Sequence, residues 1–96
     1  MNLDVISNAT LDFTPSRLID PIEMIGTMRN EVTTINLATT NIEAEGQFGL
    51  QGIIDKLSDR TSTSAGTLNV SFTPAALHIT SAQQNQCAAK NWTVVI

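Results

Sequence analysis

The sequence predicts an α/β domain in which short parallel strands alternate with helices, built as a short solenoid or, alternatively, as a small open α/β sheet. Three observations lead to this prediction. A tetrapeptide with Thr first and apolar residues second and fourth occurs four times, helical patterns lie between its copies, and the 96 residues amount to one domain. We therefore expect residues 1–96 to form a single repeat domain.

The four tetrapeptides are the expected strands, because Thr and large apolar residues at alternate positions suit a pleated surface with one buried face. Successive copies begin 24, 33 and 26 residues apart. The repeat extends beyond the strands, since FTPSRLI at Phe13–Ile19 returns as FTPAALHI at Phe72–Ile79. The expected strands are TLDF at 10–13, TINL at 34–37, TLNV at 67–70 and TVVI at 93–96.

The first expected helix covers residues 21–30. Asp20 can cap its start, Pro21 suits the first turn, and Glu23 can bond back to the cap. A stripe at three-residue spacing would face the sheet; it consists of Ile22, Ile25 and Met28.

Two further helices are expected, at 47–59 and at 81–90. The first of these has the clearest amphipathic pattern in the chain. Its apolar face consists of Leu50, Ile53, Ile54 and Leu57. The other begins with Ser81, carries Gln84 three residues later as in a capping box, and ends near Lys90, a cation that suits a helix C-terminus. Strands that alternate with helices imply parallel pairing and right-handed crossovers.

Residues 48–96 carry an ordered set of features. An aliphatic pair, Ile53-Ile54, is followed by a polar loop, the strand Thr67–Val70, a further helix and the segment Lys90–Thr93, which leads into the last strand. In this order they resemble the BspA-like leucine-rich-repeat modules of bacterial surface proteins and phage tail-associated proteins, with Asn91 where that family often has Gly. The resemblance implies a leucine-rich-repeat-like solenoid that serves as a scaffold or recognition surface at a bacterial cell surface or in a virion. Strands of only about four residues at this spacing also favour the solenoid over the open sheet.

The first functional hypothesis is a non-enzymatic repeat scaffold with a polar binding face. Alternate residues of a strand point to opposite faces, so burial of the apolar positions would leave the third position of each tetrapeptide in solvent. The candidate binding face for a protein or glycan is therefore Asp12, Asn36 and Asn69. The second hypothesis is a structural assembly protein that oligomerises through its terminal strand, because the sequence shows no capping element after that apolar segment. The candidate assembly strand is Thr93, Val94, Val95 and Ile96.

Charge and hydropathy argue against two classes of partner. The formal net charge of −4, with only five Lys and Arg, provides no basic stripe for nucleic acid. No stretch approaches the roughly 18 apolar residues of a membrane span, and the N-terminal residues lack the pattern of a signal peptide. We therefore expect neither nucleic-acid binding nor membrane insertion.

The sequence offers weak candidates for chemistry. His78 and Cys87 could form a nucleophile pair, but an Ala-rich helical segment predicts a buried, inert thiol. Asp55 and Asp59 lie one helical turn apart, yet Lys and Arg interleave with them, as on a solvated helix face. Trp92 is expected to pack at a helix-to-strand junction. We predict no catalytic activity, no metal site and no cofactor.

Overall fold

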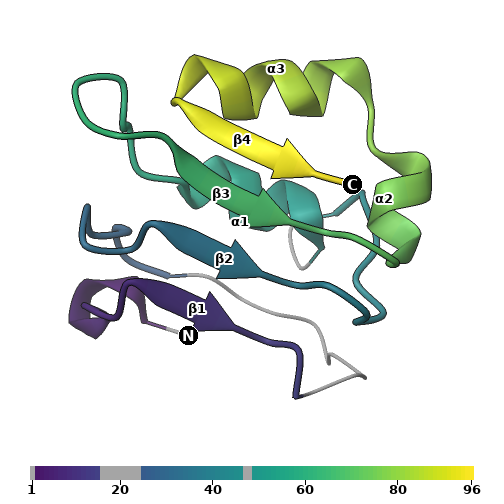
Figure 1. Cartoon of the computed structure of the whole chain (residues 1–96), viewed down its shortest axis with the longest axis horizontal. Helices are drawn as coiled ribbons and strands as arrows, with labels where there is room; N and C mark the ends of the chain where they lie inside the picture. The colour runs from purple at the N-terminus through teal and green to yellow at the C-terminus, as the bar shows by residue number, and fades with distance from the viewer. Residues whose placement is uncertain (1, 16–24, 47–48) are drawn as a thin grey trace.

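A computed structural model describes residues 2–15, 25–46 and 49–96 of the chain. It shows a small α/β domain with a four-stranded parallel sheet in the order β1-β2-β3-β4, so each strand pairs with its neighbours in sequence (Figure 1). Among the described residues the sheet is open, with β1 and β4 at its edges. The elements are η1 (Leu3–Val5), β1 (Thr10–Asp12), β2 (Thr34–Asn36), α1 (Leu50–Lys56), β3 (Gly66–Asn69), α2 (Pro74–His78), α3 (Ser81–Ala89) and β4 (Trp92–Val95).

The four predicted tetrapeptides all lie in the sheet and share one register. Thr10 pairs with Thr34, Thr34 with Thr67, and Thr67 with Thr93. The strands end one residue earlier than predicted, but the following residue still donates its N–H to the next strand. These bonds run from Phe13 to Asn36 (2.9 Å), from Leu37 to Asn69 (2.8 Å) and from Val70 to Val95 (2.8 Å).

The second position of each tetrapeptide faces the core, as predicted. Leu11 is 8% exposed, Ile35 and Leu68 are fully buried, and Val94 is partly buried against the same cluster. The helices cover this side of the sheet, since α1 lies behind β3 in Figure 1 and contributes several of the most buried side chains. The apolar face of α1 that the sequence predicts is buried in full; it consists of Leu50, Ile53 and Ile54, with Leu57 just beyond the helix.

The predicted helix 47–59 is shorter in the structure. Residues 47–48 lie outside the described residues, and α1 ends at Lys56 because Leu57 takes an extended conformation with ψ 136°. That turn keeps the Leu57 side chain buried and directs the chain to Ser58, whose carbonyl accepts a hydrogen bond from the Trp92 indole (2.8 Å).

The predicted helix 81–90 is confirmed as α3, with its cap one residue earlier than expected. Thr80, not Ser81, forms the capping box, and its partner is Gln83 instead of Gln84. Gln83 is 5% exposed because its amide also reaches across to the Ala44 carbonyl (2.7 Å), a tertiary contact that selects this register. Asn91 follows the helix with φ 62°, the left-handed conformation that Asn tolerates at a helix end.

The predicted helix 21–30 is wrong over its described part. Residues 16–24 lie outside the described residues, and residues 25–30 are not helical. Instead Ile25 forms a parallel bridge with Asn2, and its carbonyl accepts a hydrogen bond from Leu3 N–H (2.9 Å). Gly26 then turns the chain with φ 79°, which a right-handed helix does not allow. Of the predicted apolar stripe, Met28 is buried at 3% exposure, but Ile25 is 50% exposed, and Ile22 lies outside the described residues.

Candidate functional site

The solvent face of the sheet carries two rows of polar side chains. One row contains the first residues of the tetrapeptides and the other the third residues; both lie opposite the core face. Neighbouring strands of a sheet lie about 4.8 Å apart, so side chains repeat at that spacing along each row. The Thr row consists of Thr10, Thr34, Thr67 and Thr93, and the Asx row of Asp12, Asn36 and Asn69.

In the Asx row, Asp12 is exposed and held in a tight local turn. Its Oδ1 accepts hydrogen bonds from the Thr14 hydroxyl (2.7 Å) and from the Thr14 N–H (3.0 Å). These two bonds stabilise the carboxylate and lower the pKa of Asp12 below its usual value. The carboxylate is therefore ionised at neutral pH and carries the negative charge of the row.

Asn36 and Asn69 make the same kind of turn at the ends of their strands. Asn36 Oδ1 accepts from the Ala38 N–H (3.2 Å), and Asn69 Oδ1 accepts from the N–H (3.0 Å) and hydroxyl (2.7 Å) of Ser71. Because the oxygen of each amide is engaged by the backbone, the orientation of the amide is set before any ligand arrives. Each amide nitrogen keeps its two donors for other partners.

The fourth strand departs from this pattern. Val95 stands in register with Asn69, so the Asx row ends at β3. On the predicted assembly strand, Thr93 is exposed, Val94 is half-buried, and Val95 and Ile96 are 39% and 63% exposed. The polar face thus borders an apolar strip at the β4 edge.

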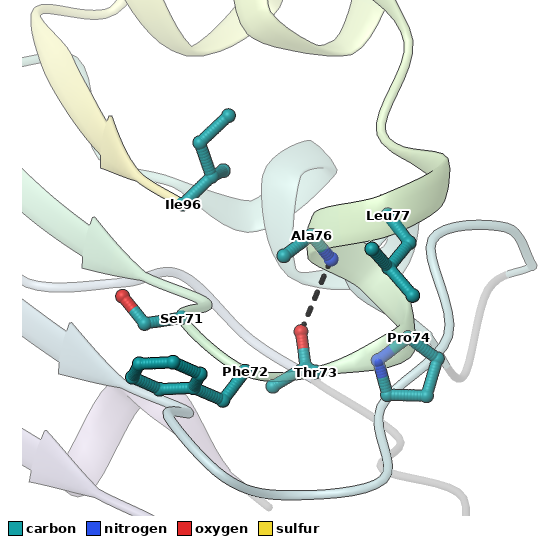
Figure 2. A pocket seen from close by; sticks show the side chains of 7 residues that line it. All are labelled: Ser71, Phe72, Thr73, Pro74, Ala76, Leu77 and Ile96. Atoms are coloured by element: carbon teal, nitrogen blue, oxygen red, sulfur yellow. Dashed lines mark hydrogen bonds between the residues drawn. The ribbon is translucent and has the colours of Figure 1, made fainter.

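An apolar groove lies next to this strip, and the sequence did not predict it. It has a volume of about 600 Å³ and is formed by the turn after β3, by α2 and by Ile96. Figure 2 shows Phe72 and Ile96 on opposite sides of the groove, with Leu77 on α2. Its lining consists of Ser71, Phe72, Thr73, Pro74, Ala76, Leu77 and Ile96.

The groove was not predicted because the two copies of the sequence FTP were expected to be structurally equivalent. Phe13 directly follows Asp12, whereas Phe72 stands three residues after its counterpart Asn69, so the two FTP segments occupy different places in the fold. The place of Phe72 corresponds to that of Thr39, and both residues have a positive φ, 59° and 63°. Phe13 packs against the core, but Phe72 is 86% exposed.

A second repeated pattern in the sequence would have identified this turn. Asn, an apolar residue, two further residues and Thr occur at 36–40 and again at 69–73. In both copies the buried Thr donates its hydroxyl to the carbonyl three residues earlier: Thr40 to Leu37 (2.7 Å) and Thr73 to Val70 (2.6 Å). Thr73 also caps α2 by accepting the Ala76 N–H (3.1 Å). This helix was not predicted.

The two residues weighed as a nucleophile pair lie in different environments. Cys87 is fully buried, and burial raises the pKa of its thiol to about 11. His78 is exposed, with Nδ1 3.8 Å from a carboxylate oxygen of Glu43. A thiol of raised pKa is protonated at neutral pH, the opposite of an activated cysteine nucleophile.

The two carboxylates that were considered as a metal site, Asp55 and Asp59, and the Trp92 side chain also have structural partners. Asp55 accepts a hydrogen bond from Gln51 (2.8 Å), and Asp59 caps its own turn by accepting the Thr61 N–H (3.0 Å). Trp92 is 3% exposed, which confirms its expected packing role. Within the described ranges, no three His, Cys, Asp or Glu side chains are placed to hold a metal ion together. In the same ranges no helix has the length and apolarity required to cross a bilayer.

No family model matches the chain, and comparisons with curated proteins and with solved structures give no match.

Proposed function

We propose that this chain is a non-enzymatic repeat scaffold that binds a protein or a glycan through the Thr row and the Asx row of its sheet. The observation that supports the proposal is the common register of the tetrapeptides, which brings hydroxyl, amide and carboxylate groups from four distant segments onto one face. Groups of this kind, repeated at strand spacing on a rigid sheet, suit a ligand that is itself extended and rich in hydrogen-bonding groups.

The same register supports a leucine-rich-repeat-like solenoid as the architecture. Each unit would comprise a tetrapeptide strand, the turn closed by an Asx side chain, and a return segment on the core side. The recurrence of Thr40 and Thr73, with the same hydroxyl-to-carbonyl bond after β2 and β3, argues for units built alike. The bacterial surface or virion as a setting rests on the resemblance of residues 48–96 alone.

Preorganisation is what would make this face a binding surface. The Oδ1 atoms of the Asx row are held by the backbone, so little side-chain entropy remains to be lost there on binding. The Thr side chains are β-branched and stiff at χ1, which fixes their hydroxyls in the same way.

The test is a ligand screen followed by removal of hydroxyls from the face. The 96-residue protein is screened on a glycan array and against a panel of bacterial surface proteins, and the affinity of each hit is compared with that of a Thr34→Val/Thr67→Val variant. Valine keeps the branched shape and strand preference but removes the hydroxyl. The loss of two hydrogen bonds is expected to weaken binding about tenfold or more.

A matched control is Thr27→Val, which changes an exposed Thr outside the sheet. Its affinity should equal that of the wild type. Equal affinity of Thr34→Val/Thr67→Val and wild type for every hit would contradict the proposal, as would a screen in which nothing binds.

The alternative function is structural assembly through β4. It is favoured by the position of β4 at an edge of the sheet and by the exposure of Val95 and Ile96. An exposed apolar edge strand is prone to pair with another chain. Pairing of this strand with the β1 edge of the next copy would be head-to-tail and would yield filaments whose mass grows with concentration.

A further inference from the structure

Three large apolar side chains project into solvent around the groove beside β4. Phe72 is 86% exposed, Leu77 82% and Ile96 63%. Most large apolar side chains of the described residues are buried, so this concentration at one place is unusual for the molecule. Contiguous exposed apolar surface of this kind commonly marks an interaction site.

The polar groups of the groove are already satisfied. The Thr73 hydroxyl donates to the Val70 carbonyl and accepts the Ala76 N–H, the contact drawn in Figure 2, and the Ser71 hydroxyl donates to Asn69 Oδ1. Neither hydroxyl needs a partner from outside. The groove therefore suits an apolar occupant, one that brings few hydrogen-bonding groups of its own.

The exposed area is sufficient for a small symmetric interface. Phe72, Leu77 and Ile96 together expose roughly 400 Å² when each large side chain is taken as about 180 Å². With Val95 and the rest of the lining, the patch approaches roughly 500 Å² per copy, so two copies would bury about 1,000 Å², the lower limit for a specific protein interface. The whole chain exposes 5218 Å², so the patch is about a tenth of the surface, as in small complexes.

Charge does not prevent a second copy of this chain from docking at this face. The chain has a net charge of −4, so two copies repel one another over most of their surface. The seven side chains that line the groove carry no charge, so two copies can meet at this face without bringing like-charged side chains into contact. A projecting Phe72 and a hollow that can receive it lie on the same face, as an isologous interface requires.

From these observations we propose that the groove is a homodimer interface, in which Phe72 of each copy enters the groove of the other about a two-fold axis. This inference goes beyond the proposed binding function, because the Thr row and the Asx row take no part in it.

The turn that carries Phe72 provides a clean test. A bulky residue at φ 59° is unfavourable, whereas Asn tolerates this conformation, so Phe72→Asn should fold at least as well as the wild type. The same substitution removes the projecting ring. Sedimentation equilibrium over a range of concentrations should show a wild-type dimer and a dissociation constant raised at least about tenfold in Phe72→Asn.

Thr39→Asn is the matched control, because Thr39 occupies the equivalent turn after β2 with φ 63° and lies outside the groove. It should keep the wild-type dimer. Raising the salt concentration should leave the dimer intact or tighten it, since no charged side chain lines the groove.

Three results would overturn the inference. They are a wild-type protein that stays monomeric at the highest concentrations, a Phe72→Asn variant that dimerises as tightly as the wild type, and a mass that keeps growing beyond two copies. The last result would support head-to-tail assembly through β4 instead. The Thr34→Val/Thr67→Val variant should dimerise as tightly as the wild type, because the polar face takes no part in the proposed interface. Failure of the dimer proposal can therefore be distinguished from failure of ligand binding at the polar face.

Discussion

Substitution of Gly66 by Ala should destabilise the protein through a single contact between β3 and β4. Gly66 pairs with Trp92, and a Cβ added to Gly66 would lie 2.5 Å from Cε3, 2.6 Å from Cδ2 and 2.7 Å from Cζ3 of the indole. Carbon atoms in contact normally lie 3.5–4.0 Å apart, so the ring would have to retreat by about 1 Å. It has little room, since Trp92 is 3% exposed and its Nε1 is bound to the Ser58 carbonyl.

The expected cost is about 1–3 kcal/mol for overpacking, and about 1 kcal/mol more if the indole loses its hydrogen bond to Ser58. For a domain of this size, each kcal/mol lowers the melting temperature by roughly 4–8 °C, so overpacking alone should lower it by about 4–24 °C. If the added Cβ did not meet the Trp92 ring, Gly66→Ala would be expected to stabilise the protein. Gly66 does not have a positive φ, and Ala at such a site would stabilise the fold by about 0.4–1 kcal/mol through the unfolded state.

The assay is thermal unfolding followed by circular dichroism and by fluorescence. Trp92 is the only Trp in the chain, so its emission reports directly on the affected ring. A double-mutant cycle with Trp92→Phe provides the control, because a smaller ring should relieve part of the clash and give a favourable coupling energy. If Gly66→Ala melts at or above the wild-type temperature with an unchanged emission spectrum, the close packing of β3 on β4 is refuted.

Other predictions address the core, the titratable groups and the polar face. Ile54→Asp places a carboxylate at a site that is 1% exposed and should abolish cooperative melting. Asn36→Asp keeps an acceptor for the Ala38 N–H and should shift the free energy of unfolding by less than about 1 kcal/mol. If Asn36→Asp were the more destabilising of the two, the assignment of Ile54 to the core and Asn36 to the solvent face would be wrong. Burial raises the pKa of Cys87 from 9.0 to about 11, so its thiolate fraction at pH 8 falls about 100-fold. A thiol reagent should therefore label Cys87 at least about 100-fold more slowly in the native state than in urea. Equal labelling rates would contradict the burial of Cys87. The pKa of Asp12 is lowered in the folded state, so the stability it contributes is present above its unfolded value near 3.8 and is lost as the pH falls through the folded value. Asp12→Asn should therefore make urea unfolding less dependent on pH in acid, and an unchanged acid profile would show that the Thr14 hydrogen bonds do not stabilise the carboxylate.

The strands and their faces could be predicted because the information is local. Alternation of Thr, an apolar residue and a polar residue determines which side chains meet the core, and the structure buries Leu11, Ile35 and Leu68 accordingly. The repetition of the tetrapeptide also predicted which residues stand side by side. The candidate polar face, whose binding role stays a prediction, is therefore the part of the site that sequence alone could assemble.

The error at 25–30 has a non-local cause. A capping residue, a Pro and an apolar stripe favour a helix by local rules, but Ile25 pairs instead with Asn2, 23 residues earlier. Thr27 N–H is likewise taken by the Asp4 carboxylate (2.9 Å). The pattern of residues 21–30 carries no information about these two partners, which lie more than 20 residues earlier in the chain.

The groove escaped prediction because it depends on a small offset in the repeat. The residues FTP have one environment when they begin directly after the Asx position and another when they begin two residues later. In the second case Phe72 falls on a left-handed turn and projects outward, and Thr73-Pro74 becomes the start of α2. Register, not composition, decides the difference.

The order β1-β2-β3-β4 bears on how the chain can acquire its structure during synthesis. Each strand after β1 emerges from the ribosome later than the neighbour that precedes it in sequence, and no strand has to be inserted between two that have already paired. The sheet can thus grow by adding each new strand to the same edge. Its core forms in step, because α1 is complete before β3 and α3 before β4. A pause in translation would therefore leave a narrower version of the same sheet, with β1 at one edge and the latest strand at the other, and not a set of strands competing for partners.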